Sequence, residues 1–530
     1  MGTVKKIIFS GVCFLLPLMS DAQNLYLPDV QEAVAGFAAS GSYNTAFLTE
    51  FPLRRVSYLQ AYGAKGNGDF VNYNQSDNAY QVGLTTESYY RFNDRIMLYG
   101  KVSYDMNRGK HMTGSSFIPD DEAPFELVEM ADSCAGDKRL EAYTLLGGVG
   151  YQLSERVSLG GKISFQASNY AKYKDLRHQN SRMKMQVDLG TTYQPATWLT
   201  LGLSYTYHRR NESIFFNVYG KTDRQYYTLV DFGGFFGRKE AFGESGYTAN
   251  DTPLFTQTHG GAFQFMVRPS HGMNWFNELY YQSNDGRFGS GDDREIIFST
   301  HKGSVLGYKG KMLIEQAKKT HVLEVRIDKH LTENYENNYK ESTDADGVSQ
   351  IFYYGKNQML DRDKWNAAVA YTFYRKAYAN RSKFHAGSRF LFSRTQSTTS
   401  VYPFYRKQTI NAWQNDVHGT YHWFKQKNIF TLALMLGYGS GGGTLKKDGT
   451  YVPVTENQKL PEQRNDLLVK QYDYLTASRI HGKLTFGYER NLMNHLAGYV
   501  KTDLFARYAF NTSLKETAYA QVELHVGVKF

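Results

Sequence analysis

The end of the chain alternates strictly between apolar and polar side chains. The apolar members are Ala518, Ala520, Val522, Leu524, Val526, Val528 and Phe530. Successive side chains of a strand point to opposite faces of a sheet, so this segment predicts a strand with one apolar and one polar face. The same two-residue period recurs at 157–166, 182–189, 199–208, 430–438 and 496–508, where no helical period fits. The chain is therefore predicted to consist mainly of strands that are apolar on one side.

The composition of the 530 residues excludes several other classes of protein. Tyr (42), Phe (34) and Gly (48) are abundant and Pro (11) is scarce, which argues against a disordered chain. The mean hydropathy is −0.52, and beyond the N-terminus there is no apolar run of about 18 residues, so helical membrane spans are excluded. A transmembrane β-barrel is not excluded, because polar and apolar residues alternate along its strands and the mean hydropathy therefore stays low.

Short turns and long polar segments follow one another along the chain. Eight short turns lie at 92–95, 153–156, 194–198, 269–274, 317–320, 376–382, 425–428 and 490–495. The long segments lie around 109–138, 210–258, 329–362 and 441–473, and aromatic residues flank the short turns. This pattern predicts an all-β, transmembrane, antiparallel up-and-down barrel with short periplasmic turns, long extracellular loops and interfacial aromatic residues. With an opening strand near 54–63 and a closing strand near 516–530, the eight hairpins make about eighteen strands; fourteen or sixteen are also compatible.

The N-terminus predicts export to the cell outer membrane. Residues 1–22 have the basic start, short apolar core and small-residue end of a cleavable signal peptide. Residues 54–530 are assigned to the barrel. Residues 23–53 are expected to be a loosely ordered periplasmic lead-in, with a short helix or an inserted plug as alternatives. Cys134 is then alone in the mature chain, so no internal disulfide is expected.

These features resemble those of bacterial outer-membrane β-barrel proteins over roughly residues 54–530. The most specific element is the terminal strand ending in Val526, Val528 and Phe530. The resemblance implies that this strand is the insertion signal read by the barrel assembly machinery. The Tyr-rich strands and long charged loops are similar to those of uncharacterised, porin-like barrels encoded beside nutrient-uptake receptors in gut-type Gram-negative bacteria.

Barrel geometry directs the polar member of each alternating pair into the lumen. The candidates for lining a pore are Lys101, Lys162, Arg182, Lys184, Asp188, Arg326, Arg389, His418, His422, Lys483, Lys501 and Arg507. One interpretation is a solvated lumen whose charges cross-link the wall. The other is a mildly cationic pore or cavity that prefers anionic solutes, because low-dielectric walls concentrate the field of fixed charges.

No catalytic, cofactor or metal motif is complete, so the chain is expected not to be an enzyme and no cofactor is assigned. His418 and His422 near Asp416, and His208 near Ser204, leave an outer-membrane hydrolase as a remote alternative. Three acidic clusters, at 120–122, at 284–286 with 292–293, and at 344–347, are interpreted as solvated turns rather than cation sites. The aromatic residues at 226–242 need a partner, which is either the packing of their own loop or a ligand.

Two functional hypotheses follow. The first is a passive outer-membrane channel or substrate-uptake porin. The second is a non-conducting accessory barrel that docks a surface lipoprotein or a TonB-dependent receptor. A fatty-acid-type transporter is less favoured because the predicted interior is charged. Outer-membrane lipid and lipopolysaccharide are the expected surroundings, and nucleic acid is excluded because the net charge of +10 is scattered rather than gathered in a patch.

Overall fold

The computed structural model describes residues 26–530, except 131–133, 221–223, 244–245, 291–295, 344–348, 379–380 and 515–516. The predicted signal peptide lies outside the described residues. No helix in the described part of the chain is long and apolar enough to cross a membrane.

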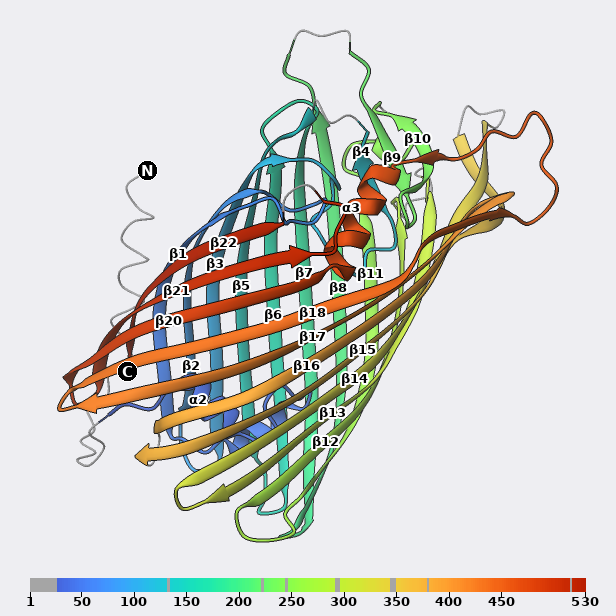
Figure 1. Cartoon of the computed structure of the whole chain (residues 1–530). Coiled ribbons are helices and arrows are strands. Elements are labelled where there is room, and N and C mark those ends of the chain that lie inside the picture. Colours follow the sequence, from blue (N-terminus) through green and yellow to red (C-terminus); the bar gives the residue numbers. More distant parts are fainter. Residues whose placement is uncertain are drawn as a thin grey trace, which may run out of the picture.

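Eighteen antiparallel strands form one closed sheet (Figure 1). Each strand pairs with its neighbour in the chain order, and β22 pairs with β1 to close the barrel. The strands are β1 (Arg55–Asn67), β2 (Asn78–Arg91), β3 (Ile96–Met112), β5 (Gly136–Gln152), β6 (Val157–Lys172), β7 (Arg177–Ala196), β8 (Leu199–Asn217), β11 (Leu254–Val267), β12 (Met273–Phe288), β13 (Ser299–Gln316), β14 (Lys319–Thr343), β15 (Ser349–Tyr378), β16 (Arg381–Val401), β17 (Phe404–Lys425), β18 (Asn428–Thr450), β20 (Ser478–Met493), β21 (Leu496–Phe510) and β22 (Ala518–Lys529). The predicted fold class and the count of about eighteen strands are confirmed.

The outer surface of this barrel is apolar. On β18, for example, Phe430, Leu432, Leu434 and Leu436 are all exposed, whereas the residues between them face the interior. Exposed apolar residues recur on the outward faces of other strands, such as Val102 on β3, Leu203 on β8 and Val526 on β22, which is the surface that a bilayer requires of a transmembrane barrel. The chain is thus an outer-membrane-type β-barrel.

One long segment was assigned wrongly from the sequence. Residues 329–362 were expected to be an extracellular loop, but β14 and β15 run through most of them and are 25 and 30 residues long. A transmembrane strand needs only about 9–11 residues. The hairpin therefore projects beyond the membrane, where both faces meet water. The backbone ladder continues there while the apolar alternation disappears, which is why the sequence pattern did not reveal the strands.

The extracellular loops fold together over the mouth of the barrel. Strands β4 (Glu126–Glu129), β9 (Tyr227–Asp231), β10 (Phe236–Ala241) and β19 (Glu462–Gln463) form a second small sheet, and helix α3 (Asn465–Thr476) lies beside it (Figure 1). We call this assembly the extracellular cap. Phe232, Phe235 and Phe236 are each no more than 2% exposed within it, so the packing of the loop itself accounts for these aromatic residues.

Residues 26–53 form an ordered segment inside the opposite, periplasmic end of the barrel (Figure 1). It contains helix α2 (Val30–Ala35) and the 3-10 helix η1 (Thr45–Glu50). The Asp29 side chain accepts a hydrogen bond from the amide of Gln31 at the start of α2, and Asn44 accepts one from Ala46 at the start of η1. The segment is therefore not the loosely ordered lead-in favoured from the sequence; we call it the plug segment.

Candidate functional site

The plug segment packs against the inner wall over much of the circumference. Its Phe37, Phe47 and Phe51 are at most 8% exposed and share one apolar cluster with residues of strands β1 to β3 and β11 to β14. Helix η1 also lies against β5, β6 and β7. Burying each aromatic side chain contributes roughly 1.5–3 kcal/mol to the free energy of packing. This packing therefore holds the plug segment in one position against the wall.

A groove of glycines receives η1. Inward-facing glycines on β5 to β8 lie so close to the plug segment that side chains there would collide with it. A Cβ at Gly160 would lie 2.1 Å from the Ala46 amide nitrogen, and one at Gly190 would lie 2.1 Å from the Asn44 side-chain oxygen. Asn44 also donates to the wall, at 2.8 Å to the Thr191 carbonyl and 3.0 Å to the Gln264 side chain. The wall and the plug segment are therefore complementary in shape and in hydrogen bonding.

A charged network anchors the other end of the plug segment. Lys529 on β22 lies 2.6 Å from Asp29 and 2.7 Å from Glu489 on β20. Arg381 on β16 pairs with the same two carboxylates. Burial opposes ionisation of Asp29, but Lys529 and Arg381 outweigh it and hold its pKa well below the usual range. Burial, together with the nearby Asp29, instead raises the pKa of Glu32 to about 7.

A cavity of about 510 Å³ lies in the lumen beneath the extracellular cap. Its lining includes the cationic side chains of Arg326, Lys364, Arg362, Arg389 and Arg479. Arg326 pairs with Asp328 at 2.7 Å, and Lys364 lies 3.5 Å from Asp121.

The other three guanidinium groups of this cavity behave differently. Arg362 donates to the Ala123 carbonyl, and Arg479 donates to backbone carbonyls at the end of α3. Within the described residues, Arg362, Arg389 and Arg479 have no carboxylate within ion-pair distance. Asp121, Glu122 and Asp328 also line the cavity but form no ion pair with these three guanidinium groups. A planar guanidinium can bind carboxylate or phosphate oxygens in a bidentate manner.

A family model described as a family of unknown function, DUF6850, matches residues 45–530. The chain belongs to this family. No curated protein matches the DUF6850 barrel.

Several solved structures resemble the DUF6850 barrel. The ferric preacinetobactin receptor BauA from Acinetobacter baumannii aligns with a TM-score of 0.40 and 9% identity, covering 90% of this chain and 80% of BauA. The outer membrane transporter YddB from Escherichia coli aligns with a TM-score of 0.38 and 8% identity, covering 89% and 80%. A FadL homologue from Pseudomonas aeruginosa aligns with a TM-score of 0.32 and 10% identity, covering 95% and 94%. Identities this low transfer no residue roles to the DUF6850 barrel.

The DUF6850 barrel places all twelve predicted pore residues on the inward-facing positions of their strands, but most are engaged by partners. Lys162 lies 2.7 Å from Asp188, and Lys483 and Lys501 share Asp503 at 2.7 and 3.1 Å. Lys184 lies 3.3 Å from Asp120 of an extracellular loop, with Arg182 3.8 Å from the same residue.

The remaining candidates divide into two groups. Arg507 donates to the Tyr474 hydroxyl, and His418 and His422 each lie near His385 of the adjacent strand. Lys101 and Arg389 form no ion pair with any residue that the structure describes. The sequence thus identified inward-facing charges but not which of them are neutralised.

Two cavity residues were missed from the sequence. Arg362 and Lys364 fall in or beside the segment that was interpreted as a loop. A signal was present, because Leu360, Arg362 and Lys364 alternate with Asp361 and Asp363. The acidic residues lie on one face and the basic residues on the other, so neither face is apolar and the segment resembles a polar loop.

The hydrolase alternative does not assemble among the residues that the structure describes. Ser204 accepts a hydrogen bond from Gln264, and His208 lies four residues along the same strand, at a rise of about 13 Å. Asp416 pairs with His481 at 2.8 Å rather than with His418 or His422. The acidic cluster at 120–122 is paired with wall residues through Asp120, whereas the clusters at 292–293 and 344–347 lie outside the described residues.

Proposed function

We propose that this DUF6850 barrel is a gated uptake channel of the outer membrane for small anionic solutes. The observation that carries this proposal is the lumenal cavity in which Arg362, Arg389 and Arg479 form no ion pair with any carboxylate of the described residues. A low-dielectric wall strengthens the field of these charges, and guanidinium groups match the oxygens of carboxylates and phosphates. A solute that entered beneath the extracellular cap would thus be drawn to this cavity.

The gate in this proposal is the plug segment. It occupies the periplasmic end, while the extracellular cap covers the other end, so passage requires movement of both. The passive channel expected from the sequence is replaced here by a channel that opens when the plug segment leaves its glycine groove. The proposed route runs from the cap to the arginine cavity and then past α2.

Electrical recording from the purified full-length protein in planar bilayers tests the proposal. We expect discrete openings and a reversal potential that favours anions in a salt gradient. Changing Arg362 and Arg389 together to Gln should shift the reversal potential towards cations. Arg394→Gln is the matched control, because Arg394 lies on the same strand as Arg389 but faces outward and should leave selectivity unchanged. A silent barrel, or equal selectivity in all three proteins, would refute the proposal.

A second candidate is the non-conducting accessory barrel, favoured by one specific observation. Phe352, Tyr353 and Tyr354 are 54%, 45% and 74% exposed on the hairpin of β14 and β15 that projects beyond the membrane. Three consecutive exposed aromatic residues provide a docking surface for another protein. In this proposal that protein is a surface lipoprotein or a TonB-dependent receptor. Replacing the three by Ser should abolish co-purification of a partner in mild detergent while leaving the barrel folded.

Export by a cleavable signal peptide, and insertion by the assembly machinery into an outer membrane containing lipopolysaccharide, complete the proposal. N-terminal sequencing of protein from the outer-membrane fraction should begin at Gln23. A chain that retains residues 1–22 in that fraction would contradict the proposed cleavage.

A further inference from the structure

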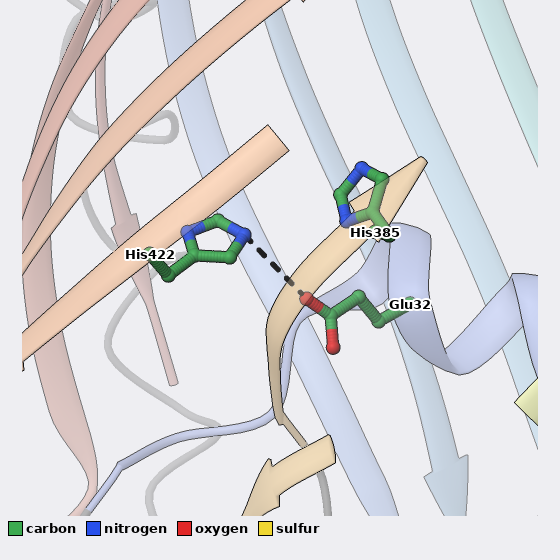
Figure 2. A group of neighbouring side chains, drawn as sticks. All are labelled: Glu32, His385 and His422. Atoms are coloured by element: carbon green, nitrogen blue, oxygen red, sulfur yellow. Dashed lines mark ion pairs between the residues drawn. The ribbon is translucent and has the colours of Figure 1, made fainter. Parts of the chain in front are cut away.

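Three side chains outside the arginine cavity meet where the plug segment touches the wall. Glu32 comes from α2, His385 from β16 and His422 from β17, and all three point toward one another (Figure 2). One potential ligand atom from each lies within 4.8 Å of the others. The His422 Nε2 is 3.9 Å from a Glu32 carboxylate oxygen, which is too far for a hydrogen bond.

Each of the two histidines presents a buried nitrogen towards this site. His422 Nε2 and His385 Nδ1 are both buried and form no hydrogen bond with any residue that the structure describes. An unsatisfied buried polar atom is costly, by about 1–3 kcal/mol. A cation bound between them would accept both nitrogens and the carboxylate as ligands.

The surrounding residues hold the three side chains in place. The other nitrogen of His422, Nδ1, lies 2.8 Å from the Thr431 hydroxyl, which leaves Nε2 directed at Glu32. The Glu32 carboxylate accepts hydrogen bonds from the amide and the hydroxyl of Ser382, both at 2.8 Å. Outer partners of this kind orient the ligands of metal sites.

The charge around the site suits a cation. The nearby acids are Asp29, Glu32 and Glu489, and the nearby bases are Arg381 and Lys529. Asp29 and Glu489 are balanced by Arg381 and Lys529, so the group has a net charge of −1 when Glu32 is ionised, as it is when it binds a cation. A second group of potential ligands, Asp503, Glu523 and His525, lacks this property, because Lys483 and Lys501 already bind Asp503.

We infer that Glu32, His385 and His422 bind a divalent transition-metal ion such as Zn²⁺, and that this ion latches the plug segment to β16 and β17. Two imidazoles and a carboxylate are ligands that zinc accepts, and they leave a fourth position for water. Ligands about 2.0–2.1 Å from a tetrahedral zinc lie about 3.4 Å apart. A side-chain shift of about 0.5 Å would therefore bring His422 and Glu32 from 3.9 Å into range.

The inference does not depend on the transport proposal, since it rests on ligand geometry and can be measured without any solute. The full-length protein is purified in detergent, stripped with a chelator and titrated with Co²⁺ and Zn²⁺. We expect one Co²⁺ per chain, with the visible absorption of a low-coordinate site that Zn²⁺ displaces. Absence of stoichiometric binding to the folded barrel would overturn the inference.

Variants connect the binding to these residues. His385→Gln and His422→Gln should each weaken binding by at least about 100-fold, because loss of an outer partner alone costs 10- to 100-fold. Thr431→Val should cost about 10- to 100-fold through the orientation of His422. His525→Gln, in the neutralised second group, is the matched control and should bind as the native protein does. Retention of the heat-modifiable mobility of a folded barrel on gels shows that each variant is assembled, and equal affinity in all of them would overturn the assignment.

The latch itself needs a separate measurement. Amide exchange of residues 29–36 should slow by at least tenfold when Zn²⁺ is added to the native protein and should not respond in His422→Gln. Metal binding with unchanged exchange in this segment would show that the ion does not hold the plug segment, and would overturn the latch.

Discussion

Replacing Gly160 with Ala should loosen the plug segment without disturbing the barrel wall. Gly160 lies on the inner face of β6, and the new Cβ would lie 2.1 Å from the amide nitrogen of Ala46 and 2.3 Å from the carbonyl carbon of Thr45. These neighbours are backbone atoms, which cannot rotate away. Helix η1 must therefore move by about 1.3 Å to reach the 3.4 Å of ordinary contact.

The magnitude follows from comparing this overpacking with the packing that it opposes. Overpacking costs about 1–3 kcal/mol. The buried side chains of Phe47, Leu48 and Phe51 contribute roughly 5–9 kcal/mol to seating η1, at about 1.5–3 kcal/mol each. The segment should therefore stay seated for most of the time, while its unseated population rises by roughly 5- to 150-fold, since 1.4 kcal/mol is a factor of ten.

Hydrogen exchange measured by mass spectrometry reports this population directly, because local opening exposes the amides. Peptides covering residues 44–51 should exchange roughly 5- to 150-fold faster in Gly160→Ala than in the native protein. Gly161→Ala is the matched control: it lies next along β6 on the outward face, and its Cβ would lie 3.7 Å from Leu189, an ordinary contact. Native protection in Gly160→Ala, or equal acceleration in Gly161→Ala, would refute the reasoning.

Three further predictions concern the closing strand and the extracellular cap. Deleting Phe530, whose amide donates to the Ser57 carbonyl and whose ring lies beneath the guanidinium of Arg55, should lower the heat-modifiable, assembled fraction on gels several-fold; unchanged assembly would show that Val526 and Val528 suffice. Burial raises the pKa of Glu126 to about 7, so the folded cap binds this proton more tightly than the unfolded chain, and the stability of the cap falls as the pH rises from about 4.5 to 7. Glu126→Gln should reduce this pH dependence, measured by amide exchange of β4. An unchanged pH dependence would show that other groups cause it. Asp120→Asn removes the carboxylate that pairs with Arg210 at 2.7 Å, which should destabilise the docked loop by roughly 3 kcal/mol and make it sensitive to trypsin; a protected loop would mean that this pair does not hold it.

The membrane explains why so much of the barrel was predictable. A bilayer demands that every second side chain be apolar wherever a strand crosses it, so the local pattern in segments such as 430–438 and 518–530 suffices to identify strands. The periplasmic ends of the strands also carry local signals, in the short turns and in the aromatic residues beside them. These constraints act on neighbouring residues and require no knowledge of distant contacts.

Outside the membrane the same constraint is absent, and prediction failed there. The outer halves of β14 and β15 meet water on both faces, so Glu333 and Asp361 resemble loop residues in the sequence although they pair with each other in the ladder. The plug segment carries apolar residues without a period that indicates their destination. Its order depends on glycines more than one hundred residues away, such as Gly160 and Gly190.

The sequence by itself determined the strand architecture, the inward direction of the charged side chains and the closing strand, because each depends on the alternation of neighbours along the chain. Only the tertiary structure decided which charges remain unpaired, where the plug segment sits and which side chains meet at the candidate metal site. Glu32, His385 and His422 are up to 390 residues apart in the chain, and they lie together because closure of the eighteen-stranded wall brings β16 and β17 beside a segment that enters from the N-terminus.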